Sequence, residues 1–241
     1  MKASHSDQQA ILELQRLDDQ LASLAQREAT LPETVALNSA VIKRNNVRDL
    51  RIAAETERTD VRRELSRAEG DVEQIMTRIQ RDEARLNSGT GTPKELEQTQ
   101  HELVTLGLRR TELEEVELAI MVQVEAISNR INELSAEEEK LAAEIADLEI
   151  KRENALTIII NERSAVSEKR AAIAAPIAQE LKDLYLKLAT DNNGNGAAPL
   201  VGNECKGCHL TINTTEVQRI STLPAEEVVR CEQCRCILVR E

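Results

Sequence analysis

The stretch LVTLGLRRTELEEVELAIMVQVEAISNRINELSAEEEKLAAEIADL, residues 103–148, decides the fold of this chain. Its apolar residues recur at alternating steps of three and four, and only Arg110, Glu117 and Glu138 interrupt them. The pattern continues for about six heptads, which predicts a coiled coil rather than an ordinary amphipathic helix. The positions of this seam are Leu103, Leu106, Arg110, Leu113, Glu117, Ile120, Val124, Ile127, Ile131, Leu134, Glu138, Leu141, Ile145 and Leu148.

A second register comes earlier in the chain and predicts the partner helix. It contains Leu65, Ala68, Val72, Ile75, Ile79 and Leu86, with Asp82 as the exception. Between the two registers, residues 87–93 read Asn-Ser-Gly-Thr-Gly-Thr-Pro, which is typical of a turn. Thr92, Pro93 and Glu95 then predict an N-cap, a proline at the first helical position and an acidic first turn. We expect the chain to reverse near 88–93, so that facing residues of the antiparallel arms have numbers that sum to roughly 181.

Two prolines and one polar run divide the rest of the chain. Pro32 and Pro176 each remove a helical hydrogen bond, so helix breaks are expected near 32 and near 176. After Pro176 a short amphipathic helix is expected, and Asp-Asn-Asn-Gly-Asn-Gly at 191–196 ends it as a linker. The predicted organisation is an antiparallel coiled-coil hairpin over 1–190, the linker 191–196 and a small domain over 197–241.

The composition agrees with long helices. The chain of 241 residues contains 31% charged residues, eight glycines, one tyrosine, and neither phenylalanine nor tryptophan. Large aromatic residues usually dominate a globular core, whereas a seam between two helices needs only Leu, Ile, Val and Ala. No apolar run approaches the 18 residues or so of a membrane span. The expected fold class is therefore mainly α, a hairpin followed by a small cysteine-rich domain.

Four cysteines near the end of the chain predict a metal site. They form two Cys-x-x-Cys pairs, and each two-residue spacer lets both thiolates face one tetrahedral ion. Four thiolates fill the coordination shell of zinc and leave no position for a substrate or an activated water. We therefore expect one structural Zn²⁺ in a zinc ribbon, which cannot bury enough apolar surface to fold without metal. The predicted ligands are Cys205, Cys208, Cys231 and Cys234.

Three other interpretations of these cysteines are open. Two disulfides would require an oxidising compartment, and the N-terminus shows no signal peptide. Cys205 to His209 also spells the attachment pattern of c-type haem, which would leave the second pair unused. Finally, His209 or the fifth cysteine, Cys236, could replace one thiolate of the metal shell. Because the paired spacing fits zinc better than any of these, the cytoplasm, where thiols stay reduced, is the expected compartment.

Two stretches of this sequence resemble a known family. One contains Pro93-Lys94-Glu95-Leu96 and Gln100-His101-Glu102-Leu103, and the other contains the two cysteine pairs with the ending Ile237-Leu238-Val239-Arg240. The chain is similar over nearly its whole length to the bacterial C4-type zinc ribbon family with an N-terminal coiled-coil hairpin. The resemblance implies an interaction protein, an adaptor or chaperone of the kind that acts on the sigma-54 factor and on secretion components. It also implies a possible role in nucleic-acid binding.

The residues themselves favour binding over catalysis. No phosphate-binding glycine loop, nucleophile motif or open metal shell is present in the sequence, so an enzyme is not expected. Long helical faces suit a protein partner, whose identity the sequence leaves open, as it does the oligomeric state. Nucleic-acid binding through the ribbon is the alternative, although residues 197–241 hold five basic and six acidic side chains and the whole chain carries −12. The candidate contact residues for a partner or nucleic acid are Lys206, Arg219, Arg230, Arg235 and Arg240.

Overall fold

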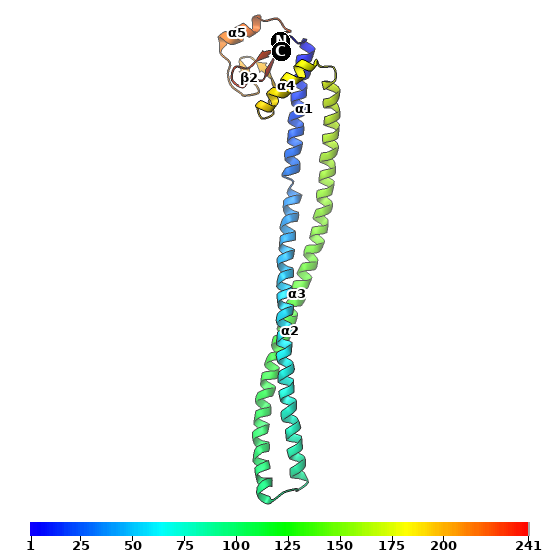
Figure 1. Ribbon diagram of the computed structural model, residues 1–241, viewed down its shortest axis with the longest axis vertical. Coiled ribbons are helices and arrows are strands. Elements are labelled where there is room, and N and C mark those ends of the chain that lie inside the picture. The colour runs from blue at the N-terminus through cyan, green and yellow to red at the C-terminus, as the bar shows by residue number, and fades with distance from the viewer. Residues whose placement is uncertain (241) are drawn as a thin grey trace. The chain divides into compact units, whose positions relative to one another are not determined.

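The computed structural model describes residues 1–240 and consists mostly of helices (Figure 1). The helices are α1 (His5–Ala29), α2 (Pro32–Asn87), α3 (Pro93–Ala174), α4 (Gln179–Asp191) and α5 (Thr214–Thr222). The strands are β1 (Ala197–Val201), β2 (Glu204–Cys205), β3 (Val229–Arg230) and β4 (Ile237–Arg240). The predicted fold class, mainly α with a helical hairpin followed by a small four-cysteine region, is confirmed.

The chain divides into two compact units. Unit 1 contains residues 1–35 together with the residues from 149 onward, and unit 2 contains residues 36–148. In unit 1, α1 packs on the sheet of residues 197–240, which we call the ribbon. The division into a hairpin over 1–190, a linker over 191–196 and a ribbon over 197–241 stays a prediction.

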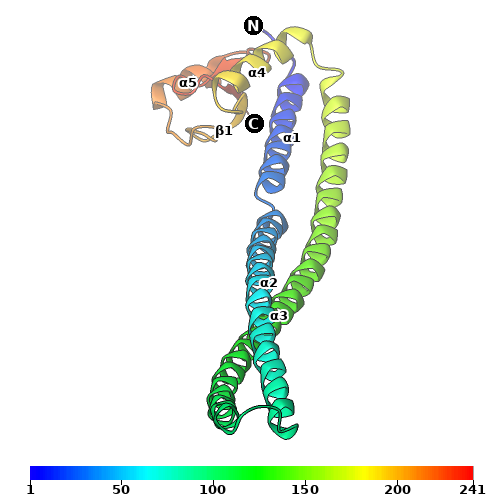
Figure 2. The same cartoon turned by 60° about the horizontal axis from the view of Figure 1, so that its bottom comes forward.

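Unit 2 is a hairpin of α2 and α3 that reverses between Asn87 and Pro93 (Figure 2). Gly89 and Gly91 have φ angles of 64° and 142°, which glycine adopts without steric cost. Thr92 then begins α3 with a capping box, in which its N–H donates to Glu95 Oε2 at 2.7 Å and its hydroxyl accepts from Glu95 N at 3.4 Å. Hydrogen bonding of the Glu95 carboxylate to the N–H of Thr92, and then to the Thr92 side chain, lowers the pKa of Glu95.

The seam of unit 2 combines small and large apolar residues. Ala40, Ala54 and Ala68 are buried at intervals of fourteen residues on α2, so a small side chain recurs on every second heptad. Glu138, one of the three charged seam positions, has a specific partner on α2, since Arg51 donates to its carboxylate at 2.9 Å. Arg51 also donates to Glu55 at 2.7 Å. The numbers of Arg51 and Glu138 sum to 189, while those of the packed residues Leu37 and Ile145 sum to 182, close to the expected 181.

Unit 1 contains the break between α1 and α2. The side chain and N–H of Thr30 both donate to the carbonyl of Gln26, and Pro32 starts the next helix without needing a donor. Leu31 in the break is 5% exposed and packs with Leu24 and Ile159. An apolar contact with α3 therefore continues through the interruption.

The main core of unit 1 lies where α1, α4 and the sheet meet, as the upper part of Figure 1 shows. Tyr185 is 1% exposed there, and its hydroxyl donates to Asp18 at 2.7 Å. Burial, and then the hydrogen bond to Asp18, raise the pKa of Tyr185. The buried residues of this core are Ala3, Ile11, Leu12, Leu14, Ile177, Leu181, Tyr185, Leu188, Ala197, Ile237 and Val239.

The sheet has the strand order β2-β1-β4-β3, with β1 parallel to β4 and both outer pairs antiparallel. Successive residues of β4 face opposite cores, because Ile237 and Val239 join α1 and α4 while Leu238 joins the cysteines. The apolar residues of residues 197–240 are thus shared between two cores. Leu210 belongs to neither core and is 50% exposed.

Candidate metal centre

Four sulfur atoms converge in the ribbon of unit 1. The Sγ atoms of Cys205, Cys208, Cys231 and Cys234 all lie within 4.8 Å of one another. The distance from Cys205 to Cys234 and that from Cys208 to Cys231 are both 3.9 Å. A tetrahedral ion with bonds of about 2.3 Å to sulfur needs its ligands roughly 3.8 Å apart. The cluster therefore fits one metal ion, and these four cysteines would hold it.

Both cysteine pairs use the same backbone turn to aim their sulfurs. His209 and Arg235 each follow the second cysteine of a pair and have left-handed φ angles of 59° and 64°. Their N–H groups donate to the carbonyls of Cys205 and Cys231 at 2.8 and 2.9 Å. The left-handed residue closes each turn, so two separate segments present equivalent pairs of sulfur ligands.

The surroundings of the sulfurs are mostly apolar. Burial raises the pKa of Cys205, Cys208 and Cys234. Burial also acts on Cys231, but hydrogen bonds from the N–H groups of Cys234 and Gln233 and from the side chains of Cys234 and Cys205 together outweigh it, so the pKa of Cys231 is lowered. A metal ion binds thiolates, so its charge would have to compensate for four partly buried negative groups. When bound, such an ion cross-links the two turns.

Neither alternative ligand joins the four sulfurs. The side chain of His209 is 75% exposed, and its Nδ1 lies 3.5 Å from Glu204. Cys236 is fully buried, with its Sγ 3.7 Å from that of Cys205 and 3.3 Å from that of Cys234, but it is not among the mutually close set. All five cysteines are free thiols. The sulfur–sulfur distances of 3.3 to 3.9 Å exclude a disulfide, because a bonded pair lies about 2.05 Å apart.

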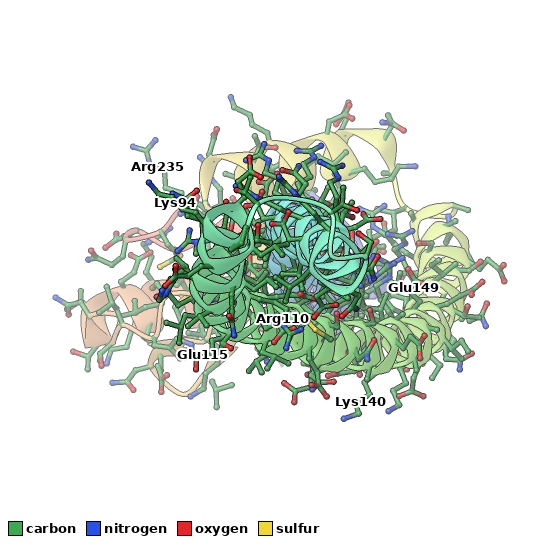
Figure 3. All side chains as sticks on the ribbon, turned by 90° about the horizontal axis from the view of Figure 1, so that it is seen from below. Lys94, Arg110, Glu115, Lys140, Glu149 and Arg235 are labelled. Atoms are coloured by element: carbon green, nitrogen blue, oxygen red, sulfur yellow. The ribbon has the colours of Figure 1, made fainter. Side chains whose placement is uncertain are left out.

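The five candidate basic residues do not form one surface. Arg219, Arg230 and Arg235 line a hollow of about 470 Å³ beside Cys231, and Arg235 extends to solvent (Figure 3). Lys206 is instead paired with Glu204 at 2.7 Å. Arg240 donates to five backbone carbonyls around the end of α5, those of Ile220, Leu223, Pro224, Ala225 and Glu227. Its guanidinium therefore has a structural role.

Two glutamines of α1 position the ribbon, and the sequence did not single them out. Gln15 accepts hydrogen bonds from the N–H groups of Gly196 and Ala197 at 2.8 and 3.1 Å and donates to the carbonyl of Gly194 at 2.8 Å. Gln8 donates to the carbonyls of Ala3 and Ala225 at 3.1 and 2.9 Å. The residues expected to be a linker are thus held against α1. The sequence signal that could have identified Gln8 and Gln15 is a polar side chain at a position of the otherwise apolar stripe of α1.

The N-terminal residues add to the same region. Lys2 pairs with Glu227 in an antiparallel bridge, the N–H of Ala3 donates to Glu226, and the N–H of Val228 donates to Met1. The segment before β3 therefore gains an extra strand-like partner from the opposite end of the chain.

Comparison with known proteins places the chain in a family. The profile of the CT398-like coiled coil hairpin domain matches residues 14–193. The chain belongs to this family. An uncharacterized protein of Mycobacterium tuberculosis H37Rv, Rv2229c, is 33% identical over 244 residues, which cover 100% of this chain and 98% of the relative. A structure from Mycobacterium smegmatis is 30% identical, with full coverage of both chains and a TM-score of 0.88.

The namesake of the CT398-like family has the same fold. The structure of CT398 from Chlamydia trachomatis matches with a TM-score of 0.73 at 18% identity, covering 98% of each chain. Among the helices in residues 1–240, none is long and apolar enough to cross a membrane.

Proposed function

We propose that this member of the CT398-like family is a non-enzymatic adaptor or chaperone that binds a protein partner through its helices and ribbon. The observation that supports this function is the apolar surface that remains after the seam is filled. Val35, Ile42 and Leu108 are between 61% and 66% exposed, while Leu106 and Ile131 in the seam are 8% and 6% exposed. Exposed apolar residues on regular helices are the usual anchors of helix-mediated recognition.

Within this proposal, the metal ion has a structural role and not a catalytic one. Four sulfur ligands directed at one another would complete a tetrahedral shell, so the ion would have no open position for a substrate. We propose one Zn²⁺ as that ion and the cytoplasm as the compartment that keeps its ligands reduced. Elemental analysis of the purified chain tests this, with one zinc per chain as the expected result.

The test of the adaptor function is an affinity pull-down from extracts of the native host. Wild-type protein is compared with the Cys231→Ser, Cys234→Ser double variant, and each sample is divided into nuclease-treated and untreated halves. A protein partner that survives nuclease treatment and is lost with the ribbon supports the adaptor and identifies its client. The sigma-54 factor and secretion components are the clients to examine first. Recovery of nuclease-sensitive RNA or DNA alone would contradict the proposal.

Nucleic-acid binding is the second candidate because three arginines share one hollow. Among the side chains that the structure describes, none forms a hydrogen bond or ion pair with the guanidinium of Arg230 or of Arg235, so both guanidinium groups are available to phosphate. Glu227 and Glu232 line the same hollow and reduce its positive charge. Filter binding of labelled RNA and DNA tests this candidate. The expected result is binding that weakens with salt and is lost in an Arg230→Glu, Arg235→Glu variant.

A further inference from the structure

A second apolar stripe runs along α3 in unit 2, on the side opposite the seam. Its members are Val104, Leu108, Leu118 and Val122, which are 63%, 66%, 60% and 65% exposed. At about 100° per residue, these four side chains point within roughly 40° of one direction, and the seam residues point the other way. We call these four residues the outer stripe.

The outer stripe is not needed to hold α3 against α2. The seam side already buries Leu106 and Ile131, and nothing in residues 1–240 covers the outer stripe. The apolar residues of α3 are accordingly distributed over more than one face of the helix. A helix with apolar residues on two opposite faces is suited to pack between two partners, of which α2 is one.

The charges around the outer stripe indicate what the second partner is. Residues 97–125 of α3 contain seven glutamates and two arginines, a formal charge of −5. Both arginines are within 3.3 Å of a glutamate on the same helix, since Arg109 pairs with Glu112 and Arg110 with Glu114. Glu115 lies within the stripe itself, and Figure 3 shows it on the outer side of α3. A second copy of this chain would bring like charges together, whereas basic side chains would pair with these glutamates.

We propose that the outer stripe docks one amphipathic helix of a partner protein, with lysine or arginine beside its apolar residues. The stripe spans 18 residue steps, or about 27 Å of helix, which a partner helix of about five turns would cover. This inference deepens the proposed adaptor function and rests on it. It assigns the partner a chemical class and places its binding site on α3.

The test uses two designed peptides as probes. Both are labelled helices of about 21 residues with leucine at heptad spacing, and they carry either lysine or glutamate at the flanking positions. Fluorescence anisotropy measures their binding to the full zinc-loaded chain. We expect the lysine peptide to bind, and to bind about tenfold or more weakly to a Leu108→Ser, Leu118→Ser variant. Glu115→Lys should also weaken binding, and the glutamate peptide should not bind.

The matched control is a Leu50→Ser, Ile52→Ser variant, because these residues of α2 are 49% and 48% exposed and lie outside the stripe. It should bind the lysine peptide like wild type, and circular dichroism should show both double variants to be folded. Equal binding by the two variants, equal binding of both peptides, or no binding of either peptide would overturn the inference. Self-association that Leu108→Ser, Leu118→Ser abolishes would overturn it in favour of a second copy.

A pull-down separates this inference from the adaptor function itself. If a protein client is captured from host extract equally by wild type and by the outer-stripe variant, the adaptor function stands and the assigned site is wrong. If no protein client is captured at all, the adaptor function fails even when the designed peptide binds.

Discussion

The seam of unit 2 and the ribbon of unit 1 reach stability in different ways. The seam repeats one kind of contact, in which Leu, Ile, Val and Ala from two helices pack at each heptad, so no single contact is essential. The ribbon contains a short four-stranded sheet and depends on four sulfurs and a few hydrogen bonds from α1. A periodic structure therefore distributes its free energy over many residues, while a small irregular one concentrates it in a few atoms.

The largest expected effect comes from the metal ligands. Cys234→Ser should unfold the ribbon, because a structural zinc site contributes several kcal/mol or more to a domain of this size. The long helices should remain, so far-UV circular dichroism should change little while proteolysis cuts residues 197–240. Cys236→Ala is the control and should retain one zinc per chain. Equal protease resistance of Cys234→Ser and wild type would contradict the concentrated stability of the ribbon.

Core truncations should differ between the two regions. Leu181→Ala removes a fully buried side chain at the junction of α1, α4 and the sheet, and we expect a loss of about 2–5 kcal/mol. Leu106→Ala, at 8% exposure in the seam, should fall at the lower end of that range because two helices can move closer together. The free energy of unfolding of both variants is measured in urea, by far-UV circular dichroism for Leu106→Ala in unit 2. Since Tyr185 is the single aromatic residue, its fluorescence follows unit 1. A larger loss for Leu106→Ala would reverse the comparison.

The contact between α1 and the ribbon should depend on one amide. Gln15→Ala leaves the N–H groups of Gly196 and Ala197 without their acceptor, at an expected cost of about 1–3 kcal/mol. Tyr185 fluorescence in urea is again the measurement. Gln20→Ala, at an exposed position of the same helix, should leave the midpoint unchanged. If both variants behave alike, the ribbon does not depend on α1 for its placement.

The smallest effect is expected at the turn of unit 2, and it depends on pH. The hydrogen bonds from Thr92 lower the folded-state pKa of Glu95, so its contribution is present above the unfolded value near 4.5 and is lost as pH falls through the folded value. Glu95→Gln should therefore lower the urea midpoint slightly at pH 7. The difference from wild type should begin to shrink near pH 4.5 and should disappear once the pH lies below the lowered pKa of Glu95 in the folded state. A difference that is constant over this range would exclude the carboxylate as its source.

Much of the hairpin and the metal centre could be predicted from spacing. Heptads report which residues face a partner helix, and two Cys-x-x-Cys pairs report a tetrahedral donor set, because both patterns are local consequences of backbone geometry. The partner of Arg51 could not be predicted, since a turn count gives the facing positions of two helices but not which long charged side chains reach each other across the seam.

The sequence by itself determined that two long helices pair, that the chain reverses between Asn87 and Pro93, and that four cysteines can share one ion. Each of these properties is encoded within a few heptads or a few residues. Only the tertiary structure decided that Gln8 and Gln15 of α1 hold the ribbon, that Arg240 binds backbone carbonyls, and that the outer stripe of α3 remains uncovered. The two glutamines bind residues 217 and 181 positions away, and Arg240 reaches carbonyls 13 to 20 positions away across a loop. The outer stripe depends on which of two apolar faces finds a partner. No periodic pattern in the sequence records any of these choices.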